Sequence, residues 1–284
     1  MKKILTGNQA VARGVYEAGV HFASAYPGTP STEILENISQ YKEIVAEWAP
    51  NEKVALEAVI GASIAGGRSI ASMKHVGVNV AADPLFTFAY TGVTGGSVLI
   101  TADEPGMHSS QNEQDNRNYA KFAKIPMLEP SNSQESKDMI IDAFELSEKY
   151  NSIIMFRMTT RVCHSKGAVE LGERIEVPLK KYEKEFNKYV AVPAIGRQLR
   201  HVVEDRMNLL KTYSETSKWN YVVDNNQSIG VIASGVAYEY AWEALGETVD
   251  YLKLGFTNPL PAGLISDFCD KHDKVYIIEE NDPY

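Results

Sequence analysis

Two acidic side chains stand at the head of a helical stretch with very small side chains, Asn51 to Ser69. Glu52 and Glu57 precede a run that is otherwise alanine, glycine, valine and isoleucine. Side chains of so little volume let a ligand or a neighbouring element approach the helix backbone closely. Tight packing accounts for the small residues equally well, and the helix dipole favours an acid in the first turn. On these residues alone a binding role and a structural role both stay open.

Polar side chains also follow two predicted strands, where ligands bind in α/β proteins. In the stretch AYPGTPST, Thr29, Ser31 and Thr32 offer hydroxyls and helix amides to an anion such as a carboxylate. Helix capping explains Ser31 and Thr32 more simply. In MKHVGVN, His75 lies on the same predicted edge, although a solitary histidine is usually structural.

A long polar loop, residues 102–117, contains His108 among aspartate, asparagine, glutamine and serine residues. Most such loops are solvated turns, but long loops in compact domains are often functional. The dinucleotide fingerprint GxGxxG, the phosphate loop GxxxxGK[ST], the nucleophile elbow GxSxG and the zinc motif HExxH do not occur in the sequence.

Hydrophobic periodicity predicts the elements that position these residues. Strands alternate with helices, which predicts an α/β fold with a parallel sheet flanked by helices. We expect strands at 20–27, 42–50, 68–77, 95–106 and 151–160, and helices at 7–19, 31–35, 51–67, 78–93 and 133–150.

A second α/β pattern begins near residue 228, after a charged stretch interrupted by prolines. Its expected strands are 228–235, 249–256 and 274–280, and its expected helices 236–245 and 261–272. We therefore predict an α/β domain at 1–161, a linker with an exposed helix at 162–226, and a second, truncated α/β domain at 227–284. The chain reaches Tyr284 directly after a strand, where a covering helix normally follows.

Composition narrows the class of protein. The formal net charge of −9 over 284 residues argues against general binding to nucleic-acid phosphates. Two separated cysteines make a disulfide framework or a cysteine-ligated cluster within this chain unexpected. No apolar run approaches the length of a membrane helix. From these features we expect a cytoplasmic protein without a membrane or nucleic-acid partner.

Several stretches together resemble the alpha subunits of indolepyruvate ferredoxin oxidoreductases, a family of thiamine diphosphate dependent 2-oxoacid oxidoreductases. They are YPGTPSTEI, NEKVALEAVIGASIAGGRS, MKHVGVNVAADPL, ADEPGMHSSQNEQDNR, LKLGFTNPLP and YIIEENDPY, and the similarity runs in order from Gly7 to the last residue. The resemblance implies a pyrimidine-binding-type first domain and a second domain like the C-terminal domain of transketolase.

The resemblance also implies roles for individual residues. Glu52 matches the glutamate that binds N1′ of the aminopyrimidine ring and favours the tautomer that removes the proton from the thiazolium ring; Glu57 is the alternative. Gly28 and Gly77 are further cofactor-binding candidates. Thr29 is expected to bind the carboxylate or carbonyl of the 2-oxoacid, and His75 and His108 to line the substrate pocket.

The implied reaction is oxidative decarboxylation of an aryl pyruvate with coenzyme A, giving an aryl acetyl-CoA, carbon dioxide and reduced ferredoxin. Family subunits are longer: they add a diphosphate-binding domain with Mg²⁺ and a domain with [4Fe-4S] clusters. We therefore expect a fragment or split subunit, inactive alone, which shares a thiamine diphosphate site within an oligomer that includes a beta subunit.

Two alternatives remain open on the sequence. The chain could be a structural or assembly subunit whose small-residue helix only forms an interface. It could also belong to a sister enzyme acting on pyruvate or a branched-chain 2-oxoacid.

Overall fold

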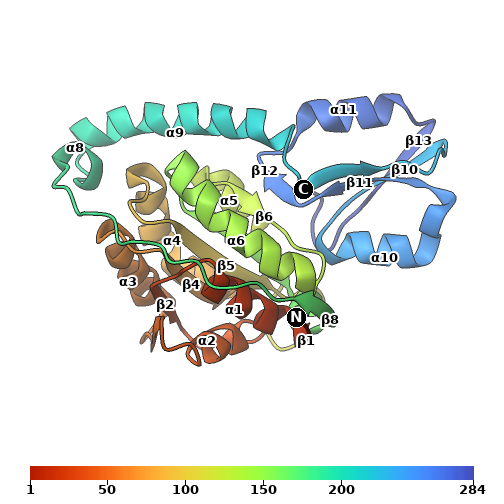
Figure 1. Ribbon diagram of the computed structural model, residues 1–284. Helices are drawn as coiled ribbons and strands as arrows, with labels where there is room; N and C mark the ends of the chain where they lie inside the picture. The colour runs from red at the N-terminus through yellow and green to blue at the C-terminus, as the bar shows by residue number, and fades with distance from the viewer.

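A seven-stranded sheet forms the centre of the computed structural model, which describes residues 1–284 (Figure 1). All neighbouring strands are parallel except the edge strand β12, which is antiparallel to β6. In spatial order the strands are β12 (Phe256–Asn258), β6 (Met127–Leu128), β7 (Ile154–Thr159), β5 (Ser97–Asp103), β4 (Ser69–Lys74), β2 (Phe22–Ala25) and β3 (Val45–Trp48). The predicted parallel α/β sheet is confirmed.

Helices cover both faces of this sheet. One face packs against α1 (Gly7–Glu17), α2 (Thr32–Ile38) and α6 (Ser133–Tyr150). The other packs against α3 (Glu52–Ile64), α4 (His75–Thr91) and α5 (Arg117–Ala123). Helix α5 was not predicted: only its first residue, Arg117, lies in the stretch taken as a loop, and no element was expected at 118–123. Helix α4 begins at His75, three residues earlier than expected, so His75 is helical.

Strand β5 shows why its sequence is a continuous apolar run. Val98 and Ile100 point into the core beneath α1 and α6, and Leu99 points into the core beneath α3 and α4. Successive side chains of a strand face opposite sides, so a strand covered on both faces needs apolar residues at every position.

The remaining elements follow β7 in the chain, apart from the N-terminal strand β1. Strand β8 (Lys166–Glu170) pairs antiparallel with β1 (Lys2–Thr6), and a short α7 (Thr160–His164) precedes it. Two helices, α8 (Phe186–Tyr189) and α9 (Pro193–Ser214), then lead to a four-stranded sheet. That sheet has the order β13 (Lys274–Ile278), β10 (Ile229–Ser234), β11 (Asp250–Leu254) and β9 (Asn220–Val223), with α10 (Gly235–Leu245), a single 3₁₀ turn (Gly246–Thr248) and α11 (Ala262–Asp270) beside it.

Strand β12 connects the two sheets, because it follows β11 in the chain yet pairs with β6 of the large sheet. Figure 1 shows the long helix α9 running between the large sheet and the smaller one. The boundaries at 161 and 226 therefore stay a prediction, since pairing crosses both of them.

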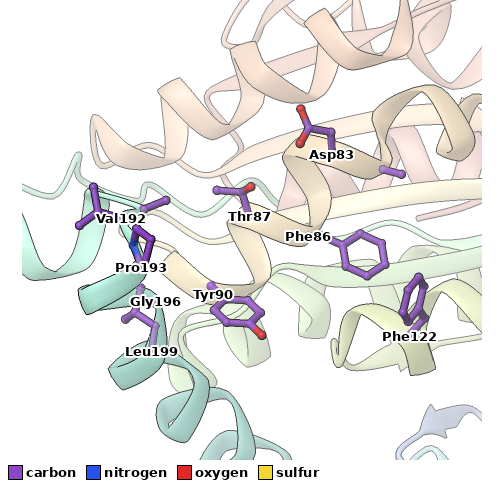
Figure 2. Close-up of a pocket in the computed structure, with 11 residues that line it drawn as sticks. Asp83, Phe86, Thr87, Tyr90, Phe122, Val192, Pro193, Gly196 and Leu199 are labelled. Atoms are coloured by element: carbon purple, nitrogen blue, oxygen red, sulfur yellow. The ribbon is translucent and has the colours of Figure 1, made fainter.

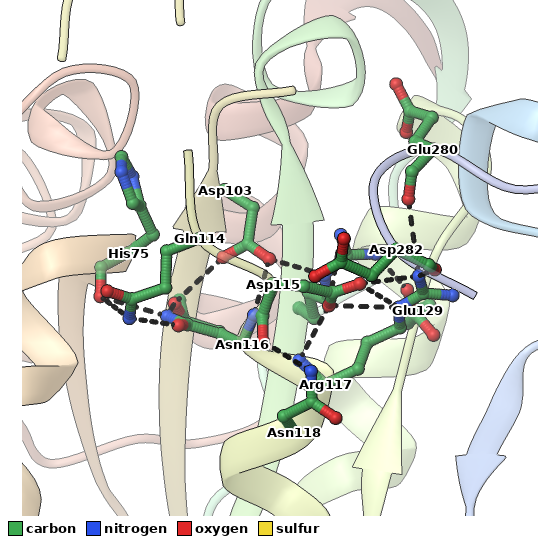
Figure 3. Close-up of polar contacts among 12 residues, drawn as sticks. His75, Asp103, Gln114, Asp115, Asn116, Arg117, Asn118, Glu129, Glu280 and Asp282 are labelled. Carbon is green, nitrogen blue, oxygen red and sulfur yellow. Dashed lines mark hydrogen bonds and ion pairs between the residues drawn. The ribbon is translucent and has the colours of Figure 1, made fainter. Parts of the chain in front are cut away.

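A buried cluster of charged side chains connects the large sheet to the last residues of the chain (Figure 3). The Arg157 guanidinium, on β7, donates to the carboxylates of Asp103 at 2.7 Å and of Glu129. All three side chains are at most 4% exposed. Burial raises the pKa of Asp103, and the charge of Arg157 opposes that rise. Removing the guanidinium would leave both carboxylates in the interior without a counter-ion.

Arg117 extends this cluster to the end of the chain. Its guanidinium donates to Asp115 at 2.6 Å, to Glu279 at 2.9 Å and to the carbonyl oxygen of Asp282 at 2.7 Å. It also lies 4.9 Å from the ring centre of Tyr284. Residues 279–284 are thereby fixed against α5.

A second polar pair stabilises the smaller sheet. The Asp250 carboxylate accepts from His272 Nε2 at 2.9 Å and from two backbone amides, those of Asn225 and Gln227. Burial opposes the charged form of His272, but its bonds to the Phe268 carbonyl oxygen and to Asp250 outweigh this and raise its pKa. None of the helices is both long enough and apolar enough to cross a bilayer.

We expect Arg157→Met to lower the free energy of unfolding by about 3–5 kcal/mol, because one partner of a buried ion pair is removed. Urea unfolding measures this. Arg197→Met is the matched control, since Arg197 is exposed and should change the value by less than about 0.5 kcal/mol. Equal effects of the two substitutions would contradict the role given to the buried cluster.

The His272 pair predicts a pH dependence. A histidine whose folded pKa lies above its unfolded value contributes stability that is complete below the unfolded pKa and is lost as the pH rises through the folded pKa. The wild-type protein should therefore lose stability between pH 6 and pH 8, and His272→Gln should lose less over the same interval. The urea midpoints of both proteins at pH 6 and pH 8 measure this difference. An equal change of the midpoint with pH in the two proteins would refute the prediction.

Candidate functional site

The candidate site lies at the carboxyl edge of the large sheet, where the order of the strands reverses. From β2 the chain runs to β3 on one side and then to β4 on the other, so the reversal falls between β2 and β4. Ligands of open α/β sheets bind in the crevice at such a point. The segments that follow β2, β3, β4 and β5 carry every residue selected from the sequence.

Glu52 is the first residue of α3, because the Asn51 side chain caps this helix by accepting from the Val54 amide. The Glu52 side chain is 8% exposed. Nearby polar contacts join Lys53 to Asp83 and to Glu57, and none involves the Glu52 carboxylate. A nearly buried carboxylate without a protein partner has its hydrogen-bonding capacity free for a ligand.

Glu57, the alternative candidate, has a different environment. It is exposed on the outer face of α3, and its carboxylate lies 4.0 Å from Lys53 Nζ.

The small residues at the end of α3 serve packing. A Cβ at Gly66 would lie 1.9 Å from the Lys180 carbonyl oxygen, whereas Gly61 faces open space. Gly61 is nine residues beyond Glu52, or about 13 Å along the helix.

Both glycine candidates lie against side chains of this chain. A Cβ at Gly77, on α4, would stand 2.7 Å from Glu52 Oε1, so Gly77 makes room for the Glu52 carboxylate. A Cβ at Gly28 would stand 3.0 Å from the side chain of Lys74, at the end of β4. The two contacts connect the loop after β2, the start of α3 and the start of α4. Direct contact of either glycine with a cofactor stays a prediction.

His75 holds the polar loop in place. It is fully buried, and its Nε2 lies 3.2 Å from the Asn112 carbonyl oxygen while Nδ1 has no partner. The Gln114 and Asn116 side chains donate to the His75 carbonyl oxygen, each at 3.0 Å (Figure 3). A substrate-binding role for His75 stays a prediction, and its observed contacts anchor the loop.

Thr29 and His108 come together at a pocket of about 400 Å³. No apolar residue lines it; the other lining residues are Glu104, Ser109, Thr160, Arg161, His164 and Ser165. The sequence analysis missed Arg161 and His164, because the segment after β7 was assigned to a linker. The stretch RVCH directly follows the predicted strand 151–160, so the same carboxyl-edge argument would have selected it.

Glu104 gives this pocket a fixed negative charge. Burial opposes its ionisation, but hydrogen bonds from neighbouring serine side chains outweigh burial and lower its pKa. The Ser109 hydroxyl donates to Glu104 at 2.8 Å. Arg161 and two histidines also line the pocket, so it offers both a cation and hydroxyl groups to an anionic ligand.

A larger concavity of about 630 Å³ lies elsewhere, between the later half of α4 and the start of α9. Figure 2 shows Phe86, Tyr90 and Phe122 on one side of it and Val192, Pro193 and Leu199 on the other. None of the residues selected from the sequence lines it. Across the chain, no group of three or more histidine, cysteine, aspartate or glutamate side chains is arranged to hold a metal ion.

Comparison with known proteins identifies the family of the chain. Residues 13–225 match the family described as pyruvate flavodoxin/ferredoxin oxidoreductase, thiamine diphosphate-binding. The chain is 45% identical to indolepyruvate oxidoreductase subunit IorA of Archaeoglobus fulgidus, over 100% of this chain and 47% of that protein. It is 47% identical to the subunit of the same name from Methanothermobacter marburgensis, over 98% of this chain and 46% of that protein.

A solved structure shares the fold. A 2-oxoglutarate:ferredoxin oxidoreductase from Magnetococcus marinus superimposes with a TM-score of 0.79 at 18% sequence identity, covering 97% of this chain and 57% of that chain. The chain spans about half the length of the curated relatives it matches. On the family match and these identities, the chain belongs to the thiamine diphosphate-binding pyruvate flavodoxin/ferredoxin oxidoreductase family.

Proposed function

We propose that this chain supplies the pyrimidine-side half of a thiamine diphosphate site in an oxidoreductase that decarboxylates indolepyruvate or related aryl pyruvates. Coenzyme A and ferredoxin are the co-substrates, and aryl acetyl-CoA, carbon dioxide and reduced ferredoxin are the products. The names of the archaeal relatives, at 45% and 47% identity, support the aryl substrate. The observation that carries the proposal is the Glu52 carboxylate, which is 8% exposed and has no protein partner.

The residues present fit the aminopyrimidine ring of the cofactor. A ring nitrogen that carries a proton would satisfy the Glu52 carboxylate, which the protein itself leaves free. The absence of a side chain at Gly77 determines where that carboxylate lies, because a Cβ at this position of α4 would collide with the Glu52 side chain. Glu52 then holds the proton at N1′ of the ring. When bound, thiamine diphosphate supplies the electron sink on which decarboxylation of a 2-oxoacid depends.

The pocket at Thr29 and His108 fits the carboxylate end of the substrate. Arg161 supplies the cation, and the Thr29 hydroxyl supplies a hydrogen bond. Charge complementarity of this kind orients an anionic substrate at the carboxyl edge of the sheet. His75 positions this pocket through its contact with the loop that carries His108.

This chain presents only one side of the proposed site, so we propose that other polypeptides complete it. Mg²⁺, the diphosphate-binding residues and the [4Fe-4S] clusters are assigned to those polypeptides, among them a beta subunit. The isolated chain should accordingly show no turnover.

Glu52→Gln should lower turnover of the complex reconstituted with the remaining polypeptides by about 10²–10⁴-fold, because the amide does not hold the proton. Steady-state reduction of ferredoxin with indolepyruvate and coenzyme A measures the effect. Glu57→Gln is the matched control and should change turnover by less than about twofold, since Glu57 is exposed.

The two open alternatives give different results in this experiment. In a purely structural or assembly subunit, Glu52→Gln would leave turnover per assembled complex unchanged and weaken only assembly, seen by size-exclusion chromatography. In a sister enzyme, kcat/KM would be higher for pyruvate or a branched-chain 2-oxoacid than for indolepyruvate.

Gly77→Ala should displace the Glu52 carboxylate, because the new methyl group would stand 2.7 Å from Oε1. We expect turnover of the reconstituted complex to fall about 10- to 100-fold, as misplacement of a reacting group does. Gly61→Ala is the control: it has open space, should stabilise the helix by up to about 1 kcal/mol, and should leave turnover unchanged. A fully active Gly77→Ala complex would refute the positioning role.

A further inference from the structure

A second pocket, of about 470 Å³, opens at the carboxyl edge of the smaller sheet. The chain runs from β10 to β11 on one side and then to β13 on the other side of β10, so strand order reverses between β10 and β13. Residues at the ends of both strands, Ser234 and Ile277, line the pocket. This site has the topological position of a ligand crevice, and its volume suits a small molecule. It is separate from the proposed cofactor half-site.

The body of the pocket is aliphatic. Five side chains from β10, β11, β13, α11 and the segment before α11 form its walls: Ile232, Leu254, Leu260, Ile265 and Ile277. Walls without charges favour an apolar body, and ring-shaped molecules bury such a surface with little loss of conformational freedom.

The polar end of the pocket contains hydroxyls without partners. Thr257 is 2% exposed, and its Oγ1 forms no hydrogen bond. The Tyr284 hydroxyl is also buried without a partner, and burial raises its pKa, so it stays protonated. Ser234 precedes α10, an eleven-residue helix whose first turn receives no side-chain cap. Thr257, Tyr284 and the first-turn amides of α10 therefore offer hydrogen-bond donors to a ligand, beside the positive end of the helix dipole.

A charged ligand does not suit these surroundings. Arg117, the cation in the lining, already binds Asp115, Glu279 and the chain end. An added anion would also face those carboxylates, and an added cation would meet the N-terminus of α10.

From this geometry we propose that the pocket binds an uncharged molecule with a planar, apolar ring system and one hydrogen-bond acceptor, which Thr257 and Tyr284 contact. This assignment does not depend on the proposed oxidoreductase function.

Titration of the full chain with quinoline tests the proposal. Quinoline is planar and apolar and has one acceptor nitrogen; naphthalene has the same shape without it, and indole has a donor instead. NMR spectra of isoleucine and leucine methyl groups report the site directly, because Ile232, Leu254 and Ile265 line it. We expect quinoline to shift these methyl signals and to bind at least about fivefold more tightly than naphthalene or indole.

Three variants locate the interaction. Thr257→Val preserves the shape and should remove the preference for quinoline over naphthalene. Ile265→Trp should fill the pocket and abolish binding of both. Ile229→Trp, at the opposite end of β10, is the control and should leave both affinities unchanged. Thermal unfolding shows whether each variant is folded. If Thr257→Val does not fold, the binding affinities of Ile265→Trp decide the test.

Four results would overturn the proposal. They are absence of shifts at the pocket methyl groups up to the solubility limit, equal affinities for quinoline and naphthalene, binding that survives Ile265→Trp, and shifts confined to residues around Phe122 on the other concavity.

Discussion

The fold depends on two buried guanidinium groups that neutralise a larger number of carboxylates. Arg157 binds Asp103 and Glu129, and Arg117 binds Asp115 and Glu279. The charged groups come from β5, β7, α5, the loop between β5 and α5, and the segments after β6 and β13. A buried charge is tolerable only beside its partner. The relative positions of these elements, and with them the loop that carries His108, are consequently determined by the ion pairs.

The same constraint limits what the amino-acid sequence could predict. Periodicity located α6 and the strands β5 and β7, because their partners are uniform apolar surfaces and a local pattern is enough. It missed β1, β6, β8, β9 and β12, none of which exceeds five residues. The partner of β1 is far away in the sequence, since Lys2 pairs with Glu170 and Thr6 with Lys166. Nothing local in the stretch around Arg117 indicates that it binds residues 279–284.

The residues selected from the sequence all follow strands at the carboxyl edge of the large sheet, but the sequence did not predict the environment of each one. Residue type alone could not separate Glu52 from Glu57, because both are glutamates of the same helix, α3. The structure separates them by burial, since one carboxylate is enclosed beside Gly77 and the other is in solvent beside Lys53. The structure also adds Arg161 in α7; the strand before it, β7, was predicted, but the residues after that strand were assigned to a linker.

Strand β12 has a consequence for how the chain folds during synthesis. Its partner β6 is only two residues long and would otherwise be the edge of the large sheet, but it is separated from β12 by more than a hundred residues. A nascent chain that has emerged only as far as α9 therefore presents an unpaired edge, the kind of surface that recruits strands from other molecules. Completion of the sheet has to wait for the smaller sheet to be translated, so the second half of the chain protects the first from aggregation.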